Sequence, residues 1–301
     1  MMRHMPAAPN GRLVPVHDTH LYIVERGAPD GLPVLVLHGG PGLDHTMFGD
    51  YLDPLGDRYR LVLVDGRGQG RSDRDSDPRS WTLTQHASDV SAVAAAIGVE
   101  EYAVLGHSFG AFVALQHAAD APGAAVATIA SSGVPADRFL NAVPQGLAVF
   151  EPEELRAQVT ASWEREATVQ TEDEARQLLA DQLPWHFADP RDPRIADYAE
   201  QTVHMRYAPD VLRATSLEGG GLSIDVEDAL TRVPQPLLAC TGRHDRTCVP
   251  AASERIAELA PKGELHIFEN AGHMTFVEST AEFLTVVGGF LDRATANAPH
   301  H

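Results

Sequence analysis

The chain has 301 residues, of which 44% are hydrophobic and 22% charged, a composition typical of one large globular domain or of a core with an inserted subdomain. Its formal net charge of −19 disfavours nucleic acid, anionic membrane surfaces and highly anionic substrates as partners, because these need clustered lysine and arginine. The two cysteines are too few for a disulfide framework, and neither a signal peptide in Met1–Leu13 nor a membrane span is predicted, so we expect a cytoplasmic protein.

Apolar runs alternate with helical patterns along most of the chain. Residues 13–16 and 21–25 predict a hairpin. Continuous apolar runs predict buried strands at 33–37, 61–64, 102–105, 124–130, 235–241 and 264–269. Helices are predicted at 83–97, 109–119, 251–260 and 281–294. Strands that alternate with helices imply right-handed crossovers, so the predicted fold class is α/β, with a mostly parallel sheet flanked by helices.

The character of the sequence changes between residues 135 and 233. This stretch is rich in proline, tryptophan and acidic residues, including the cluster Glu172-Asp173-Glu174. Such a composition suits amphipathic helices better than strands. We interpret it as a helical cap inserted into the sheet domain, which divides the chain into core residues 12–134, cap residues 135–233 and core residues 234–295.

The pentapeptide Gly106-His107-Ser108-Phe109-Gly110 lies between a predicted strand and a predicted helix. In that setting Gly-x-Ser-x-Gly is typical of a nucleophile elbow. The two glycines remove side chains where the sharp turn brings strand and helix together. The sequence therefore predicts Ser108 as a nucleophile at the carboxyl end of a strand; an ordinary turn serine is the alternative.

A serine hydroxyl needs a base that a third group orients. Hydrolases of this sheet type supply these partners in the chain order Ser, Asp or Glu, His. Asp245 and His273 each follow a predicted strand, which places both at the edge of the sheet where Ser108 lies. We predict Asp245 as the orienting acid and His273 as the base. Glu269 and His244 are the alternatives, and their placement and chain order disfavour them.

Acyl transfer also needs donors for a developing oxyanion. The loop His38-Gly39-Gly40-Pro41-Gly42 follows the strand 33–37 and brings backbone N–H groups within reach of a substrate oxygen. We predict that the N–H groups of Gly40 and Phe109 form the oxyanion hole; a glycine-rich turn without a ligand is the alternative. The loop lacks the glycine spacing of phosphate-binding motifs.

With these motifs the chain resembles the α/β-hydrolase superfamily over nearly its whole length. Two loops, His38–Gly42 and Asp65–Ser72, resemble the proline iminopeptidase branch, as does Ser162-Trp163-Glu164. The resemblance implies the α/β-hydrolase fold and removal of an N-terminal residue, preferably proline, from short peptides. Gly66 stands where members of this branch typically carry glutamine.

The resemblance also implies carboxylates near the cap that hold the substrate's amine. Glu164 and Glu200 are the candidates, with a solvated surface position as the alternative for both. Arg246 stands where some relatives use an acidic residue for this purpose. The large side chains Trp163, Trp185, Phe276 and Phe109 are candidate pocket walls, or else plain core.

The predicted chemistry is serine hydrolysis through an acyl-enzyme, with no metal or organic cofactor. The leading substrate is a small peptide or amide that loses its N-terminal residue. A carboxylesterase or lactonase acting on a small neutral ester is the alternative. A non-catalytic ligand receptor on the same fold is the more remote one. The sequence makes no prediction about the oligomeric state.

Overall fold

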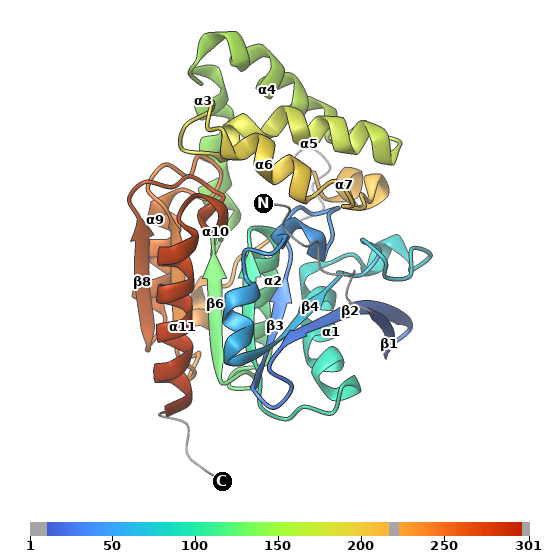
Figure 1. The fold of residues 1–301 in the computed structure, drawn as a ribbon, viewed down its shortest axis with the longest axis vertical. Coiled ribbons are helices and arrows are strands. Elements are labelled where there is room, and N and C mark those ends of the chain that lie inside the picture. The colour runs from blue at the N-terminus through green and yellow to red at the C-terminus, as the bar shows by residue number, and fades with distance from the viewer. Residues whose placement is uncertain (1–10, 217–222, 297–301) are drawn as a thin grey trace, which may run out of the picture.

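An eight-stranded sheet in the order β1-β2-β4-β3-β5-β6-β7-β8 forms the centre of the molecule (Figure 1). The computed structural model describes residues 11–216 and 223–296. The strands are β1 (Arg12–Val16), β2 (Thr19–Gly27), β3 (Leu32–Leu37), β4 (Tyr59–Val64), β5 (Ala103–His107), β6 (Ala127–Ser131), β7 (Leu237–Gly242) and β8 (Gly263–Phe268).

The predicted hairpin and the predicted mostly parallel sheet are confirmed. Strands β1 and β2 pair antiparallel, as do β2 and β4, whereas every pair from β4–β3 to β7–β8 is parallel. Strand β5 is buried along its whole length, as expected for a strand that is covered on both faces. Strand β6 begins at Ala127 rather than at 124, because Ala124 N–H bonds to Ala121 O in the turn that follows the preceding helix.

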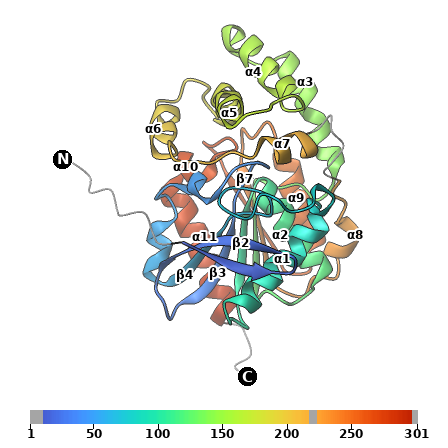
Figure 2. The same ribbon diagram turned by 90° about the vertical axis from the view of Figure 1, so that its right-hand side faces the viewer.

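Helices cover both faces of the sheet (Figures 1 and 2). On one face lie α1 (Leu83–Ala96), α2 (Phe109–Asp120) and α9 (Pro250–Leu259). These helices share a hydrophobic core with the strand side chains that point to this face. The other face is packed against α11 (Thr280–Ala296). Among the helices of the described ranges, none combines the length and the apolarity needed to cross a bilayer.

Further helices lie above the carboxyl ends of the parallel strands (Figures 1 and 2). They are α3 (Ala142–Ala148), α4 (Glu153–Arg165), α5 (Glu172–His186), α6 (Arg194–Gln201) and α7 (Pro209–Thr215). The acidic cluster predicted to be helical forms the first turn of α5, where Thr171 and Glu174 make a reciprocal capping box. Residues 135–233 are called the cap segment below. Its boundaries remain predictions.

The end of the cap segment belongs to the packing of the sheet domain. The short helix α8 (Glu227–Leu230) packs on α2 and α9. Ile224, Val226 and Leu230 are buried in the same hydrophobic cluster as those two helices. The part of the cap segment that overlies the strand ends is therefore α3 to α7. Residues 217–222 lie outside the described ranges.

Candidate active site

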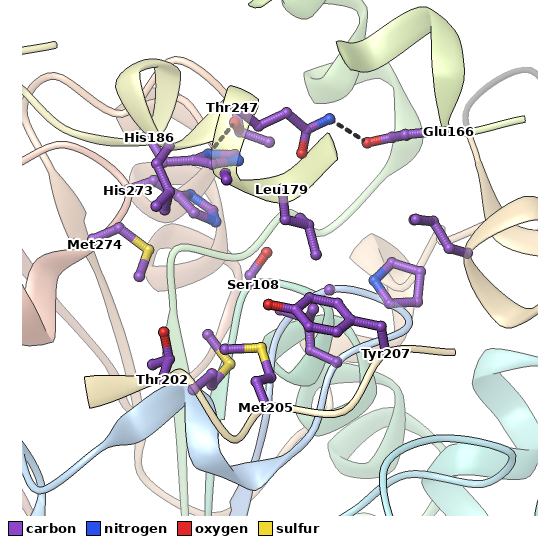
Figure 3. A pocket seen from close by; sticks show the side chains of 18 of the residues that line it. Ser108, Glu166, Leu179, His186, Thr202, Met205, Tyr207, Thr247, His273 and Met274 are labelled. Carbon is purple, nitrogen blue, oxygen red and sulfur yellow. Dashed lines mark hydrogen bonds between the residues drawn. The ribbon is translucent and has the colours of Figure 1, made fainter. Parts of the chain in front are cut away.

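Ser108 occupies the sharp turn between β5 and α2. Its φ of 55° and ψ of −120° place an L-residue in the left-handed region, where backbone strain is expected. A Cβ at Gly106 would collide with the carbonyl oxygen of Gly110, and one at Gly110 with that of Leu37. The two glycines therefore permit the close approach of strand and helix that this turn requires. The Ser108 side chain faces a cavity (Figure 3).

His273 and Asp245 form a buried pair next to this turn. His273 Nδ1 lies 2.8 Å from Asp245 Oδ2, and both residues are 4% exposed. The other carboxylate oxygen, Oδ1, accepts the N–H groups of Thr247 at 2.9 Å and Cys248 at 2.8 Å. Thr241 Oγ1 donates to Oδ2 at 2.9 Å. Four donors therefore hold the carboxylate in a single orientation.

The electrostatics of this pair favour an ionised carboxylate. Burial by itself raises the pKa of Asp245, but the charge of His273 and the hydrogen bonds to the carboxylate outweigh it, so the net pKa is lowered. An ionised Asp245 only accepts hydrogen bonds, so His273 carries its proton on Nδ1 when the ring is neutral. The remaining nitrogen, Nε2, is then a proton acceptor.

Ser108 and His273 line the same cavity (Figure 3). In the part of the chain that the structure describes, the Ser108 hydroxyl makes no hydrogen bond. The alternatives to Asp245 and His273 lie elsewhere: Glu269 is exposed and paired with Arg243, and His244 is exposed.

The backbone N–H groups of Gly40 and Phe109 are both available as donors. Phe109 is the first residue of α2, so its N–H has no intrahelical partner. The N–H of Gly39 is engaged by Met47 Sδ at 2.8 Å, whereas that of Gly40 makes no hydrogen bond within the described ranges. Gly40 has a φ of 114°, a conformation that favours glycine. Gly40 and Ser108 both line the cavity.

The cavity has a volume of about 370 Å³ and lies between the strand ends and the cap segment (Figure 3). Its walls are mainly apolar and come from both the core and the cap helices. The apolar side chains include Leu43, Met47, Leu179, Leu183, Met205 and Leu212. A largely apolar cavity above a candidate nucleophile suits a small organic substrate.

Of the six predicted pocket residues, Trp163 alone lines this cavity. Phe109 is buried and packs against His86 instead. Glu164 and Glu200 are exposed on α4 and α6 and do not contribute to the wall. Trp185 is fully buried, with its Nε1 donating to Thr247 Oγ1 at 2.9 Å, and Phe276 packs edge-on against His107 at a centroid distance of 5.0 Å. These two aromatic rings are core, which was the alternative.

The polar cavity residues that the sequence reasoning missed include Glu166, Gln182 and His186. Glu166 accepts a hydrogen bond from Gln182 Nε2 at 2.7 Å (Figure 3), and burial raises the pKa of Glu166 to about 7. Helical spacing was the available signal. Glu166 lies three residues after Trp163, and His186 four after Gln182, so each pair shares one helix face.

The ring of His186 packs against the ring of His273 in a tilted arrangement. The two ring centroids are 5.0 Å apart, with an interplanar angle of 36°. Burial lowers the pKa of His186 to about 3, with the charge of His273 adding to the effect, so the ring is neutral near pH 7. His186 also accepts the backbone N–H of His273 at its own carbonyl oxygen, 2.7 Å away. The cap segment thus contacts the predicted base directly.

A set of charged contacts, here called the clasp, fastens residues Trp185–Ala188 of the cap segment to Arg246 and Glu278 of the core. The Arg246 guanidinium donates to the carbonyl oxygens of Trp185 at 3.1 Å, Phe187 at 2.6 Å and Ala188 at 3.1 Å. A cation at the C-terminal end of α5 is favourable because the last helical carbonyls are otherwise unpaired.

The acidic side of the clasp joins the same segment to the loop of His273. Glu278 accepts the N–H of Ala188 at 2.7 Å on Oε1 and that of Gly272 at 2.9 Å on Oε2. Gly272 directly precedes His273, so this carboxylate connects the end of α5 to the loop of the predicted base.

Two clusters contain residue types that could ligate a metal ion. They are Asp245, Cys248 and His273, and separately Asp44, His45 and Asp65. In the first, Asp245 is surrounded by four protein donors, and burial raises the pKa of Cys248, which keeps its thiol protonated. In the second, Asp65 Oδ1 accepts from both the backbone N–H of His45, at 2.8 Å, and its Nδ1, at 2.6 Å. Protein partners account for the arrangement of both carboxylates.

Residues 33–280 match the family described as alpha/beta hydrolase fold, and the chain belongs to this family. A proline iminopeptidase of Heyndrickxia coagulans is 27% identical over 273 residues, which cover 87% of this chain and 91% of that protein. The crystal structure of a proline iminopeptidase of Mycobacterium smegmatis has a TM-score of 0.73 and 26% identity, with coverage of 95% and 98%.

A thermophilic esterase from Thermogutta terrifontis, at 20% identity and a TM-score of 0.72 over 95% of this chain and 99% of that one, shares the fold. The expected α/β-hydrolase fold is confirmed, as is the resemblance to proline iminopeptidases. The chain is a hydrolase.

Proposed function

We propose that this hydrolase works through an acyl-enzyme, with Ser108 as nucleophile, His273 as general base and Asp245 as the orienting acid. The observation that carries the proposal is the buried pair of His273 Nδ1 and Asp245 Oδ2, 2.8 Å apart, beside a serine on a left-handed turn. Its Nδ1–H tautomer leaves Nε2 free to take a proton. The N–H groups of Gly40 and Phe109 are the proposed oxyanion donors.

In this mechanism Ser108 Oγ attacks the substrate carbonyl while His273 Nε2 accepts its proton. The negative charge that develops on the carbonyl oxygen is stabilised by the two backbone N–H groups. His273 then returns the proton to the leaving group as the tetrahedral intermediate collapses to an acyl-enzyme. Water, activated by the same imidazole, attacks the acyl carbonyl and releases Ser108.

The leading substrate class is a short peptide or small amide that loses its N-terminal residue. Two observations support it: the relatives that are proline iminopeptidases, and the carboxyl of Glu166 in the cavity wall. Glu166, rather than the exposed Glu164 or Glu200, is the carboxyl that we propose to bind a substrate amine. An amine bound there would favour the ionised form of this carboxyl.

A neutral ester or lactone is the second candidate class. It is favoured by the largely apolar cavity wall and by the raised pKa of Glu166, which leaves this carboxyl partly protonated near pH 7. Arg246 stands where the resemblance would place an acidic residue that binds an amine. Its guanidinium is a cation and donates to the carbonyl oxygens of the clasp, so it offers no carboxylate to an amine.

A substrate panel separates these classes. Proline 4-nitroanilide, 4-nitrophenyl butyrate and γ-butyrolactone are assayed with wild type, Ser108→Ala and Glu166→Gln. The peptidase proposal expects cleavage of the anilide, with kcat/KM lowered selectively for the anilide in Glu166→Gln. Ester or lactone turnover without anilide cleavage would establish the second class.

Ser108→Ala is the test of the mechanism itself. We expect it to abolish turnover of every substrate in the panel while leaving the fold intact, as judged by circular dichroism. Full activity in this variant would refute the proposed nucleophile. Tight ligand binding without turnover of any substrate by wild type would favour the receptor alternative.

A further inference from the structure

The two glycine-containing loops of the core meet beside the proposed oxyanion donors. Gln69, fully buried in the loop after β4, accepts the backbone N–H of Gly42 on its Oε1 at 2.6 Å. A Cβ at Gly66 would lie 2.6 Å from Gln69 Nε2, so the glycine makes room for this amide. Gln69 therefore lies across Gly66 and fastens the loop that carries Gly40.

The nitrogen of this amide has no partner among the described residues. Gln69 Nε2 is buried and makes no hydrogen bond to any described residue, and the same holds for His86 Nε2 on α1. An unsatisfied buried polar atom is destabilising, so two of them need a physical reason. Both side chains line one small cavity of about 30 Å³, together with Phe109 and Gly110 of the elbow.

The size of this cavity admits one water molecule, and the two unpartnered nitrogens supply its polar partners in an otherwise apolar lining. Roughly 10–15 Å³ of cavity and two or more polar partners are enough to hold a buried water. Burial lowers the pKa of His86 to about 4, so the imidazole is neutral near pH 7. A water accepts the Gln69 N–H and either donates to His86 Nε2 or accepts from it, so both tautomers are satisfied.

His86 also supports the second proposed donor. Its ring packs edge-on against Phe109, with centroids 5.3 Å apart and an interplanar angle of 88°. Gln69 thus holds the loop of Gly40 on one side, while His86 backs Phe109 on the other.

We propose that one buried water bridges Gln69 Nε2 and His86 Nε2, and that these two side chains are positioning residues for the oxyanion donors Gly40 and Phe109. This inference rests on the proposed function, because that function assigns the two N–H groups their role. The bridge joins the loop that holds Gly42 to helix α1, which packs against Phe109, so the two proposed donors are linked through it. Small displacements of such donors reduce catalysis steeply.

A double-mutant cycle tests the bridge. Gln69→Met keeps the length of the side chain, and His86→Phe keeps the ring edge against Phe109 while filling the cavity. Each single variant is expected to lower kcat roughly tenfold for the panel substrate that wild type turns over, with KM changed less than about twofold. The double variant is also expected to lose roughly tenfold rather than a hundredfold, because either change alone removes the water.

Two further variants sharpen the cycle. Gly66→Ala places a Cβ against Gln69 Nε2, so it is expected to match Gln69→Met in the wild-type background and to add little in the Gln69→Met background. His117→Phe is the matched control: His117 is a buried histidine on α2 with an unpartnered Nδ1, and it lies outside both cavities. Its kcat is expected to equal that of wild type, and its effect to be independent of Gln69→Met.

A crystal structure of the wild type provides the direct readout. We expect a solvent peak within hydrogen-bonding distance of both nitrogens, absent from Gln69→Met/His86→Phe. Independent, multiplicative effects on kcat, or the lack of a solvent peak, would overturn the inference. The proposed function is refuted separately, by retained activity of Ser108→Ala. In that case the solvent peak, and non-additive effects of Gln69→Met and His86→Phe on the free energy of unfolding in urea, still test the bridge.

Discussion

Replacing Asp245 by asparagine is the sharpest test of the buried pair. The substitution keeps the size of the side chain but turns one of the two acceptor oxygens into a donor. If Oδ1 stays with the N–H groups of Thr247 and Cys248, the new NH₂ group faces Thr241 Oγ1 and His273 Nδ1. The Thr241 hydroxyl can rotate to accept, because it lies 3.4 Å from a second acceptor, the carbonyl of Cys248.

The consequence for the base is larger than the consequence for the fold. An NH₂ group donates to His273 Nδ1, so the neutral ring carries its proton on Nε2 and can no longer accept one from Ser108. The carboxylate charge that stabilises the imidazolium is lost as well. Loss of tautomer and charge together lowers kcat about 10⁴-fold, equivalent to about 5.5 kcal/mol of activation free energy.

The assay is steady-state hydrolysis of whichever panel substrate wild type turns over, at several pH values, combined with urea denaturation. Asp89→Asn is the matched control, because Asp89 is also buried but accepts from Arg67, at 2.8 and 2.9 Å, rather than from a histidine. We expect the control to lose stability while keeping kcat within about twofold. If Asp245→Asn kept more than about a tenth of wild-type kcat while Ser108→Ala was inactive, the role given to this carboxylate would be refuted.

Two further predictions concern the cap segment. The pKa of Glu166 is raised from 4.5 to about 7, so between these pH values the native state holds a proton that the unfolded chain releases. The free energy of unfolding therefore falls as pH rises from about 4.5 to 7, by at most about 3 kcal/mol. Urea denaturation at several pH values should show that Glu166→Gln removes this pH dependence. An unchanged slope in the variant would assign the pH dependence to other groups. Arg246→Met leaves three carbonyls of the clasp without their donor, so we expect the free energy of unfolding to drop by about 2–4 kcal/mol and amide exchange at 186–188 to accelerate, whereas Arg243→Met, which removes the exposed pair with Glu269, should cost less than about 1 kcal/mol. Equal losses of unfolding free energy in the two arginine variants would show that the clasp stabilises the protein no more than an exposed ion pair does.

The sheet and the position of the candidate chemistry could be predicted because topology fixes both. A strand buried on two faces must be apolar throughout, and parallel strands bring their carboxyl ends to one edge. Residues that directly follow β5, β7 and β8 therefore meet whatever the intervening segments do. Ser108, Asp245 and His273 each lie at such a strand end.

The walls of the cavity could not be predicted in the same way. Neighbouring positions on a helix point about 100° apart, so an error of one or two residues exchanges cavity and solvent. Glu164 is exposed while Glu166 lines the cavity, and Trp185 is core while His186 faces His273. Acidic side chains occur on several faces of the cap helices, so their spacing does not indicate which face of each helix points to the cavity. The contact of the clasp with the base loop joins residues far apart in sequence and has no local signal.

Because of the clasp, we expect the end of α5 to tolerate fewer amino-acid substitutions than helices α3 and α4. The hydrogen bonds of the clasp tie the end of α5 to the loops of Asp245 and His273, so we expect substitutions there to affect the proposed base. Helices α3 and α4, by contrast, pack mainly on each other, on α5 and on the short turn that precedes them. An exchange confined to residues 142–166 would change the wall that contains Trp163 and Glu166 without removing a hydrogen bond of the clasp. Phe150, which packs on Trp185 and Arg246, is the residue of this range that such an exchange has to keep. We therefore expect the substrate preference to be open to change through one helical hairpin while the core is kept.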